Sequence, residues 1–185
     1  MLGLSQGVSS SSPLVTAADA ILSYSSDFSS SVDGFEGWDL ASSQVDTDAT
    51  LTAGVDFGGK TDVLKITWSA TEPLGVFQIR KSFSELDDQD GRTFTVVFSA
   101  DIYYDFTTSG DLSTFVQAGH QLSGSYTVVN NTDVAQDQWV TISDTKVFSG
   151  SQLYDEYLYI GFVDAADKPQ SGDEMYVTNI SFTIL

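Results

Sequence analysis

The chain has 185 residues, and its 26 acidic and 7 basic side chains give a formal net charge of −19. That charge repels phosphate backbones and anionic lipid headgroups, so it argues against nucleic acid and membrane surfaces as partners. The chain contains no cysteine, which excludes disulfides and thiolate metal sites, and no run approaches the roughly 18 apolar residues of a membrane-spanning helix.

Residues 1–31 hold 11 serines and no charged side chain before Asp19. Such a composition buries too little apolar surface to order itself alone. The sequence therefore predicts an extended N-terminal arm over 1–31 and one folded domain over 32–185. Within the arm, residues 13–24 can form a strand or a short helix if a partner receives them. The N-terminus lacks the features of a signal peptide, which favours folding in a cytosol.

From residue 49 onward, short segments of alternating apolar and polar residues are separated by turns rich in Gly, Asp and Ser. The segments predicted as strands are 49–56, 62–70, 75–83, 92–104, 112–119, 123–129, 138–148, 156–164 and 174–185. No segment keeps apolar helical spacing over three turns, so no crossover helices are available for a parallel sheet. The pattern predicts an all-β fold, an antiparallel two-sheet β-sandwich of the jelly-roll type.

The alternation also assigns a face to each side chain, because successive residues of a strand point to opposite sides. The apolar residues expected to form the core are Leu64, Ile66, Trp68, Phe77, Ile79, Phe94, Val96, Phe98, Val140, Ile142, Leu158, Ile160, Phe162, Tyr176, Ile180, Phe182 and Ile184. Trp139 lies opposite Val140 and Ile142, where it is either a plug at the sheet edge or an exposed contact.

The faces opposite the core carry aromatic, amide and guanidinium groups, which can stack on sugar rings and bond their hydroxyls. The candidate carbohydrate-binding residues are Gln78, Arg80, Tyr103, Phe115, Gln117, Tyr157 and Tyr159. The same residues can equally pack under a loop or against another subunit.

Features of a catalytic site are weak in this sequence. His120 is the only histidine, and the chain has no G-x-S-x-G elbow, so the sequence does not indicate a Ser-His-Asp triad. Among 26 acids some pair will fall at a distance suitable for a glycosidase by chance, and no feature marks a cleft that would raise the pKa of one carboxyl group. We therefore predict a non-enzymatic role.

Six segments of the chain follow one another in an order known from a protein family. They are FEGW (35–38), VLKITWS (63–69), FQIRKSF (77–83), GRTFTVVFSAD (91–101), QWVTISDTKVF (138–148) and EMYVTNISFTIL (174–185). Their order resembles the carbohydrate-binding modules of families four, nine and twenty-two. The resemblance implies a β-sandwich jelly roll that holds glycan chains against aromatics and amides on a concave sheet, often with a structural calcium.

The resemblance also implies candidate calcium ligands at Asp27, Glu36 and Asn179. Where the family often has two acids, this chain has Thr178 and Asn179. Three oxygen donors fall short of the about 6 to 8 ligands that calcium takes. We therefore expect no cofactor, with structural calcium as the alternative.

The opening residues MLGL, the serine-rich arm and the acidic sandwich also resemble structural proteins of marine tailed phages. This resemblance implies a virion surface protein, a capsid decoration or tail-associated protein that folds in the host cytoplasm. Such a protein would dock on capsid or tail proteins through its arm and form a homo-oligomer, with a trimer as the first candidate. The alternative is a free-standing carbohydrate-binding module, secreted or extracellular, that recognises polysaccharide through aromatic and amide residues on one sheet.

Overall fold

The computed structural model of the chain describes residues 20–26, 28–29, 35–40, 49–70, 76–87, 89, 91–107, 112–119, 127–149, 156–163 and 169–185. Its elements are β1 (Leu22–Ser26), η2 (Phe35–Gly37), β2 (Trp38–Leu40), β3 (Ala49–Phe57), β4 (Lys60–Trp68), β5 (Val76–Ser82), α1 (Ser84–Asp87), β6 (Thr93–Asp105), β7 (Leu112–Ala118), β8 (Thr127–Val134), β9 (Val140–Ser149), β10 (Tyr157–Val163) and β11 (Glu174–Ile184). The nine strands predicted from residue 49 onward are confirmed as β3 to β11. The largest shift is in β8, which spans Thr127–Val134 where residues 123–129 were predicted.

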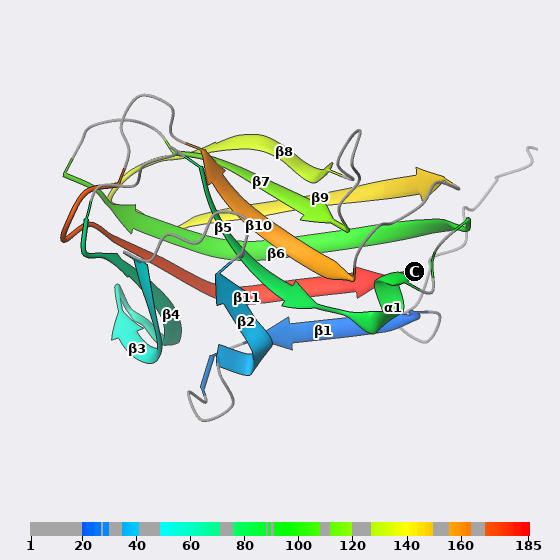
Figure 1. Cartoon of the computed structure of the whole chain (residues 1–185), viewed down its shortest axis with the longest axis horizontal. Helices are drawn as coiled ribbons and strands as arrows, with labels where there is room; N and C mark the ends of the chain where they lie inside the picture. The colour runs from blue at the N-terminus through cyan, green and yellow to red at the C-terminus, as the bar shows by residue number, and fades with distance from the viewer. Residues whose placement is uncertain are drawn as a thin grey trace, which may run out of the picture.

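The strands form two antiparallel sheets that pack face to face (Figure 1). The six-stranded sheet has the order β3-β4-β11-β6-β9, with β1 also paired to β11, and the five-stranded sheet has the order β2-β5-β10-β7-β8. In Figure 1, β5 and β10 cross over β6 and β11. The predicted antiparallel β-sandwich is therefore confirmed.

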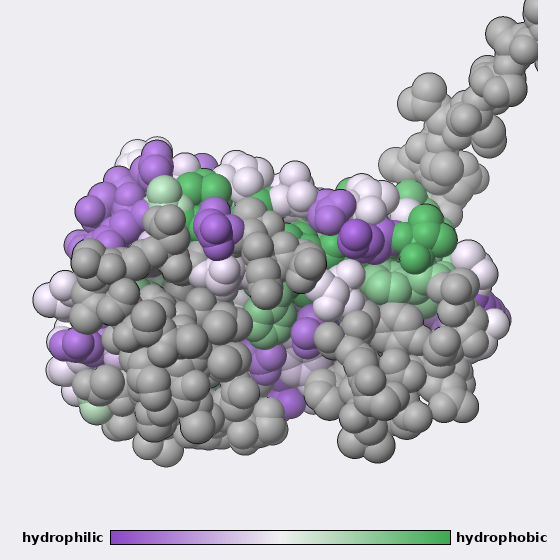
Figure 2. All heavy atoms as spheres, turned by 90° about the horizontal axis from the view of Figure 1, so that it is seen from above, coloured by the Kyte–Doolittle hydropathy of each residue, from purple (hydrophilic) through white to green (hydrophobic). Residues whose placement is uncertain are grey.

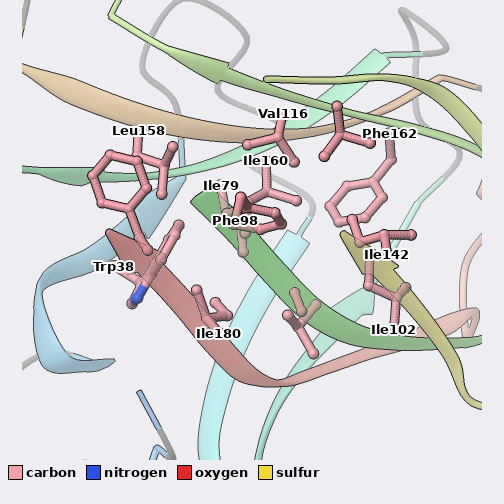
Figure 3. Packing of buried hydrophobic residues seen from close by; sticks show 14 of the residues in the cluster. Trp38, Ile79, Phe98, Ile102, Val116, Ile142, Leu158, Ile160, Phe162 and Ile180 are labelled. Carbon is pink, nitrogen blue, oxygen red and sulfur yellow. The ribbon is translucent and has the colours of Figure 1, made fainter. Parts of the chain in front are cut away.

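Side chains of the two sheets meet in one hydrophobic core (Figure 3). Leu158 and Ile160 of β10 enter it from the five-stranded sheet, and Phe98 and Ile102 of β6 enter it from the six-stranded sheet. All four side chains are fully buried. The alternation predicted Leu158, Ile160 and Phe98 as inward residues, and Ile102 continues the inward positions of β6 beyond the predicted set. The opposite face of β10 consequently points away from the core.

Strand β11 changes face in its middle, where a β-bulge interrupts its pairing with β6 between Thr178 and Ser181. Asn179 within the bulge has the left-handed φ of 51°. Val177 before the bulge and Ile180 after it both belong to the core, so the bulge inverts the alternation. Tyr176 is consequently buried outside the core cluster, and its placement among the core residues was wrong.

Residues 22–26 belong to the sandwich rather than to an arm. Strand β1 pairs with β11 from Leu22 opposite Ile184 to Ser26 opposite Ile180. The predicted arm over 1–31 is thus wrong for these residues, because β11 of the same chain receives them as a strand. Residues 1–19 lie outside the described residues.

The described residues on the face seen in Figure 2 are mostly hydrophilic or intermediate in hydropathy. Figure 2 shows hydrophobic residues only in small groups among hydrophilic and intermediate ones. Among the described residues, the large hydrophobic side chains that are exposed are Ile21 and Val147. Val147 lies on the edge strand β9 beside Lys146, and a charged edge of this kind disfavours pairing with another chain. The described part of the chain has no helix of the length and apolarity needed to span a membrane.

We expect the core to respond to Phe98→Ala with a loss of about 3 to 5 kcal/mol in the free energy of unfolding, because the change opens a cavity between the sheets. Val147→Ala, at a position that is 67% exposed, is the control and should change it by less than about 0.5 kcal/mol. Urea unfolding of both variants measures the difference. A loss below about 1 kcal/mol for Phe98→Ala would contradict the assignment of the core face.

Candidate functional site

The outer face of the five-stranded sheet brings together six of the seven candidate binding residues. They are Gln78 and Arg80 on β5, Tyr157 and Tyr159 on β10, and Phe115 and Gln117 on β7. The register places Tyr159 opposite Arg80 on one side and opposite Gln117 on the other. Three neighbouring strands thus present aromatic, amide and guanidinium groups on one surface, which we call the β10 face.

Aromatic rings follow the length of β10 on this face. The ring centroids of Tyr157 and Tyr159 are 6.0 Å apart. At the next outward position the strand has Gly161, and the ring of Phe115 from β7 lies over it. Tyr159 and Phe115 are only 8% and 9% exposed, whereas Tyr157 is half-buried. The rings therefore form an enclosed floor that is most accessible near Tyr157.

Arg80 is the one cation on the β10 face among the described residues of β5, β7 and β10 whose side chains point outward. Its guanidinium carbon lies 4.3 Å from the centroid of the Tyr157 ring, within range of a cation–π interaction. Its Nε is buried, and this N–H has no hydrogen-bond partner among the residues that the structure describes. An unsatisfied buried donor costs roughly 1 to 3 kcal/mol, so an acceptor on a bound ligand would stabilise this site.

Asp39 adds a carboxylate beside the same face, and it was not among the residues predicted from the sequence. It lies on β2 opposite Arg80, and it is exposed. Strand β2 has only three residues, which is too short for an alternating pattern to be recognised.

Tyr103 does not belong to the β10 face, and its grouping with the other six residues was wrong. It lies on β6 in the six-stranded sheet, where its ring centroid is 4.8 Å from that of Phe57 and 5.7 Å from that of Trp139. The alternation assigns a side chain to one face of its own strand, but it does not say which sheet that strand joins.

A second group of aromatic residues, the outer aromatic cluster, lies on the outside of the six-stranded sheet. Its members are Phe57, Tyr103, Trp139 and Tyr176. The Phe57 and Tyr176 rings stack with centroids 3.7 Å apart and planes 5° apart. Lys60 lies over the Trp139 ring, with its Nζ 5.0 Å from the centroid. The rings of this cluster thus contact each other and a cation of the same chain, and Tyr176 is the buried one among the four.

Trp139 holds the turn between β3 and β4 in this cluster. Its indole N–H donates to the carbonyl oxygen of Gly58 at 3.2 Å. Gly58 and Gly59 both have positive φ, 57° and 81°, as the two central residues of a tight hairpin turn require. Trp139 therefore packs on the β3–β4 hairpin of its own chain. Of the two alternatives that the sequence left open, this packing role replaces the exposed contact.

Asp101 joins the outer aromatic cluster to the bulge in β11. Its carboxylate accepts hydrogen bonds from Lys60 Nζ at 2.9 Å, from Asn179 Nδ2 at 2.7 Å and from the hydroxyl of Thr141. Burial alone would raise the pKa of Asp101, but these three donors outweigh it and hold the pKa below its usual value. The ionised form of Asp101 is therefore favoured by the fold.

The candidate calcium ligands are only partly described. Glu36 accepts a hydrogen bond from Ser26 Oγ at 2.5 Å, and Asn179 donates to Asp101. Ser26 and Asn179 line a pocket of about 360 Å³ beside the bulge, together with Ser25, Ile180 and Ser181. Within the described residues no group of three or more His, Cys, Asp or Glu side chains is placed to hold a metal ion.

Asp27 and His120 lie outside the described residues. Without Asp27, the remaining side chains supply fewer oxygens than the 6 to 8 or so that calcium takes, so they do not fit a calcium site on their own. Structural calcium stays the alternative that the family resemblance implies.

The fold is similar to that of two solved carbohydrate-binding domains. One is the CBM22-1 xylan-binding domain of Paenibacillus barcinonensis Xyn10C, with a TM-score of 0.52 and 15% identity over 90% of this chain and 94% of that domain. The other is the C-terminal family 22 carbohydrate-binding module of Clostridium thermocellum Xyn10B, with a TM-score of 0.53 and 16% identity over 91% of this chain and 95% of that module. The chain matches no protein-family model and no curated protein.

These similarities confirm the predicted resemblance at the level of fold. The chain has the β-sandwich of carbohydrate-binding modules, consistent with the jelly roll expected from its sequence. At 15 to 16% identity, the similarity does not carry over the ligand of either protein.

We expect Asp101→Asn to lower the urea midpoint more at pH 6 than at pH 3. Because the folded-state pKa of Asp101 lies below its unfolded value of about 3.9, its ionised form stabilises the fold above about pH 4. This stabilisation is lost as the pH falls through the folded-state pKa, so wild type and variant should converge in acid.

Asp144→Asn is the matched control, since it removes the same charge from an exposed position on β9. If Asp101→Asn lowered the urea midpoint equally at both pH values, the ionised form of the Asp101 carboxylate would not be what stabilises the fold.

Proposed function

We propose that this chain is a non-catalytic carbohydrate-binding domain that holds a neutral polysaccharide on the β10 face. The observation that carries the proposal is the combination of rings, two amides and the buried Arg80 Nε on one sheet face, where this N–H has no partner within the described part of the chain. Sugar C–H groups stack on aromatic rings, while amides and a guanidinium bond hydroxyls. The similarity in fold to carbohydrate-binding modules supports this proposal.

The charge of the chain favours a neutral glycan. At −19, the chain would repel an acidic polysaccharide over most of its surface. One of the similar domains is described as xylan-binding, so xylan is the first ligand to test, followed by glucans and mannans. The face supplies stacking surfaces and hydrogen-bond donors, and we propose no bond cleavage. In this role the protein acts outside a cell.

The difference between the two aromatic surfaces also supports the β10 face as the binding site. In the outer aromatic cluster, the Phe57 ring covers Tyr176, and Lys60 lies over Trp139 and pairs with Asp101. The β10 face has contacts of the same kind, since Arg80 lies over the Tyr157 ring and the Tyr157 and Tyr159 rings are 6.0 Å apart. The β10 face differs in the buried Nε of Arg80, which has no hydrogen-bond partner among the described residues.

The virion role expected from the N-terminal sequence gains no support from these observations. It depended on an arm that docks on capsid or tail proteins, and residues 22–26 of that arm pair with β11. The virion surface location and the homo-oligomer remain predictions of the sequence.

We expect Tyr159→Ala to weaken retention of the protein on an insoluble-xylan column or in a xylan affinity gel about 3- to 10-fold, because the change removes a stacking surface at the centre of the β10 face. Tyr103→Ala is the matched control, since it deletes the same side chain from the other sheet and should leave retention unchanged. The thermal midpoint of each variant separates loss of binding from unfolding.

Equal losses for Tyr159→Ala and Tyr103→Ala would contradict the β10 face as the site. If the wild type binds none of xylan, glucans and mannans, the proposed function is wrong and the similarity to carbohydrate-binding modules is one of fold alone.

A further inference from the structure

Gly161 gives the Phe115 ring its position. A Cβ on Gly161 would lie 1.9 Å from Phe115 Cζ and 2.4 Å from both Cε1 and Cε2. These distances describe a point directly above Cζ along the normal to the ring, since a point in the ring plane would be farther from the two Cε atoms. The ring therefore lies with its face on the backbone of Gly161, in the space that any larger residue would fill.

Phe115 thus completes a row of three rings along one strand. Outward positions of a strand repeat every two residues, about 6.7 Å apart, and Tyr157 and Tyr159 occupy two of them with centroids 6.0 Å apart. Gly161 is the third outward position, and there β7 supplies the ring. The row runs parallel to β10.

Polar groups flank this row on both sides. Gln78 on β5 lies opposite Gly161, and Arg80 lies opposite Tyr159. On the other side, Gln117 of β7 lies opposite Tyr159. A chain of sugars that followed the rings would therefore pass between hydrogen-bonding groups on two neighbouring strands.

A path across the strands offers less stacking. At the level of Tyr159, the residues in register from β2 to β7 are Asp39, Arg80, Tyr159 and Gln117. That line contains one ring and three polar side chains. The line along β10 contains three rings with polar groups beside them, which suits a polymer of pyranose rings better.

We propose that the β10 face binds a linear neutral glycan lengthwise along β10 over at least three consecutive sugars, and that Gly161 is the positioning residue that lets Phe115 form the third subsite. The inference rests on the proposed function and adds the direction of the ligand, the number of subsites and the role of Gly161.

The dependence of affinity on ligand length tests the proposal. Calorimetric titration with xylobiose, xylotriose and xylotetraose, or with the matching fragments of a glucan or mannan if that is the polysaccharide retained, should show wild-type affinity rising from two sugars to three. Phe115→Leu keeps an apolar side chain but removes the ring face. It should lower the affinity for three or more sugars about 3- to 10-fold and change the affinity for two sugars by less than about 2-fold.

Gly161→Ala should reproduce the effect of Phe115→Leu, because its methyl group displaces the ring. The double variant Gly161→Ala/Phe115→Leu should bind no more weakly than Phe115→Leu, since both changes remove one subsite. Thermal midpoints show whether each variant folds. If Gly161→Ala does not fold, the length dependence of Phe115→Leu still decides the matter.

Asp39→Asn is the control for the direction of the bound glycan, because Asp39 lies at the β2 end of the row of residues that runs across the strands. It should leave the length dependence unchanged. The proposal is overturned if Phe115→Leu weakens all lengths equally or none, or if Asp39→Asn alone removes the gain from the third sugar. Absence of wild-type binding to every glycan overturns the proposed function and this inference with it, whereas wild-type binding with an unaltered length dependence in Phe115→Leu overturns only the inference.

Discussion

The packing of the inward side chains of β10 against those of β6 decides which face of each strand can act on a ligand. Leu158 and Ile160 meet Phe98 and Ile102 in a core from which water is excluded. Burial of these side chains stabilises the fold roughly in proportion to the apolar area removed from water. Because strand side chains alternate, this packing also fixes Tyr157, Tyr159 and Gly161 on the outside. The candidate site is therefore a consequence of the core on the opposite side of the same strand.

The sequence predicted those parts of the fold that depend on a regular alternation. Strand β10 is an example, since its seven residues have no bulge and their faces follow directly from the pattern. Tyr176 was misplaced because the bulge at Asn179 breaks the alternation in a way that no local pattern marks. Strand β2 was missed, and the strand at residues 22–26 was placed in the arm as a segment that could become a strand on a partner, because each is short and is stabilised by a partner far away in the chain.

The candidate site was predicted in part for a related reason. Six of its residues share a face because their strands are neighbours in one sheet, whereas Tyr103 belongs to the other sheet. Strand order depends on contacts between segments distant in sequence, and the alternation within one segment carries no information about them. The role of Gly161 is a further example, since it follows from a ring on a neighbouring strand.

The bulge in β11 affects how the sequence of this chain can be aligned with the sequences of proteins of similar fold. Before Asn179 the odd-numbered residues of β11 point into the core, as Val177 does. After it the even-numbered residues do, as Ile180 does. In a protein of similar fold that has one residue fewer between positions 178 and 181, every second residue along the whole strand would point into the core. An alignment that continues through this point without a gap would pair outward residues of one protein with core residues of the other after the bulge. Substitutions in β11 should therefore be interpreted from the structure rather than from the alignment.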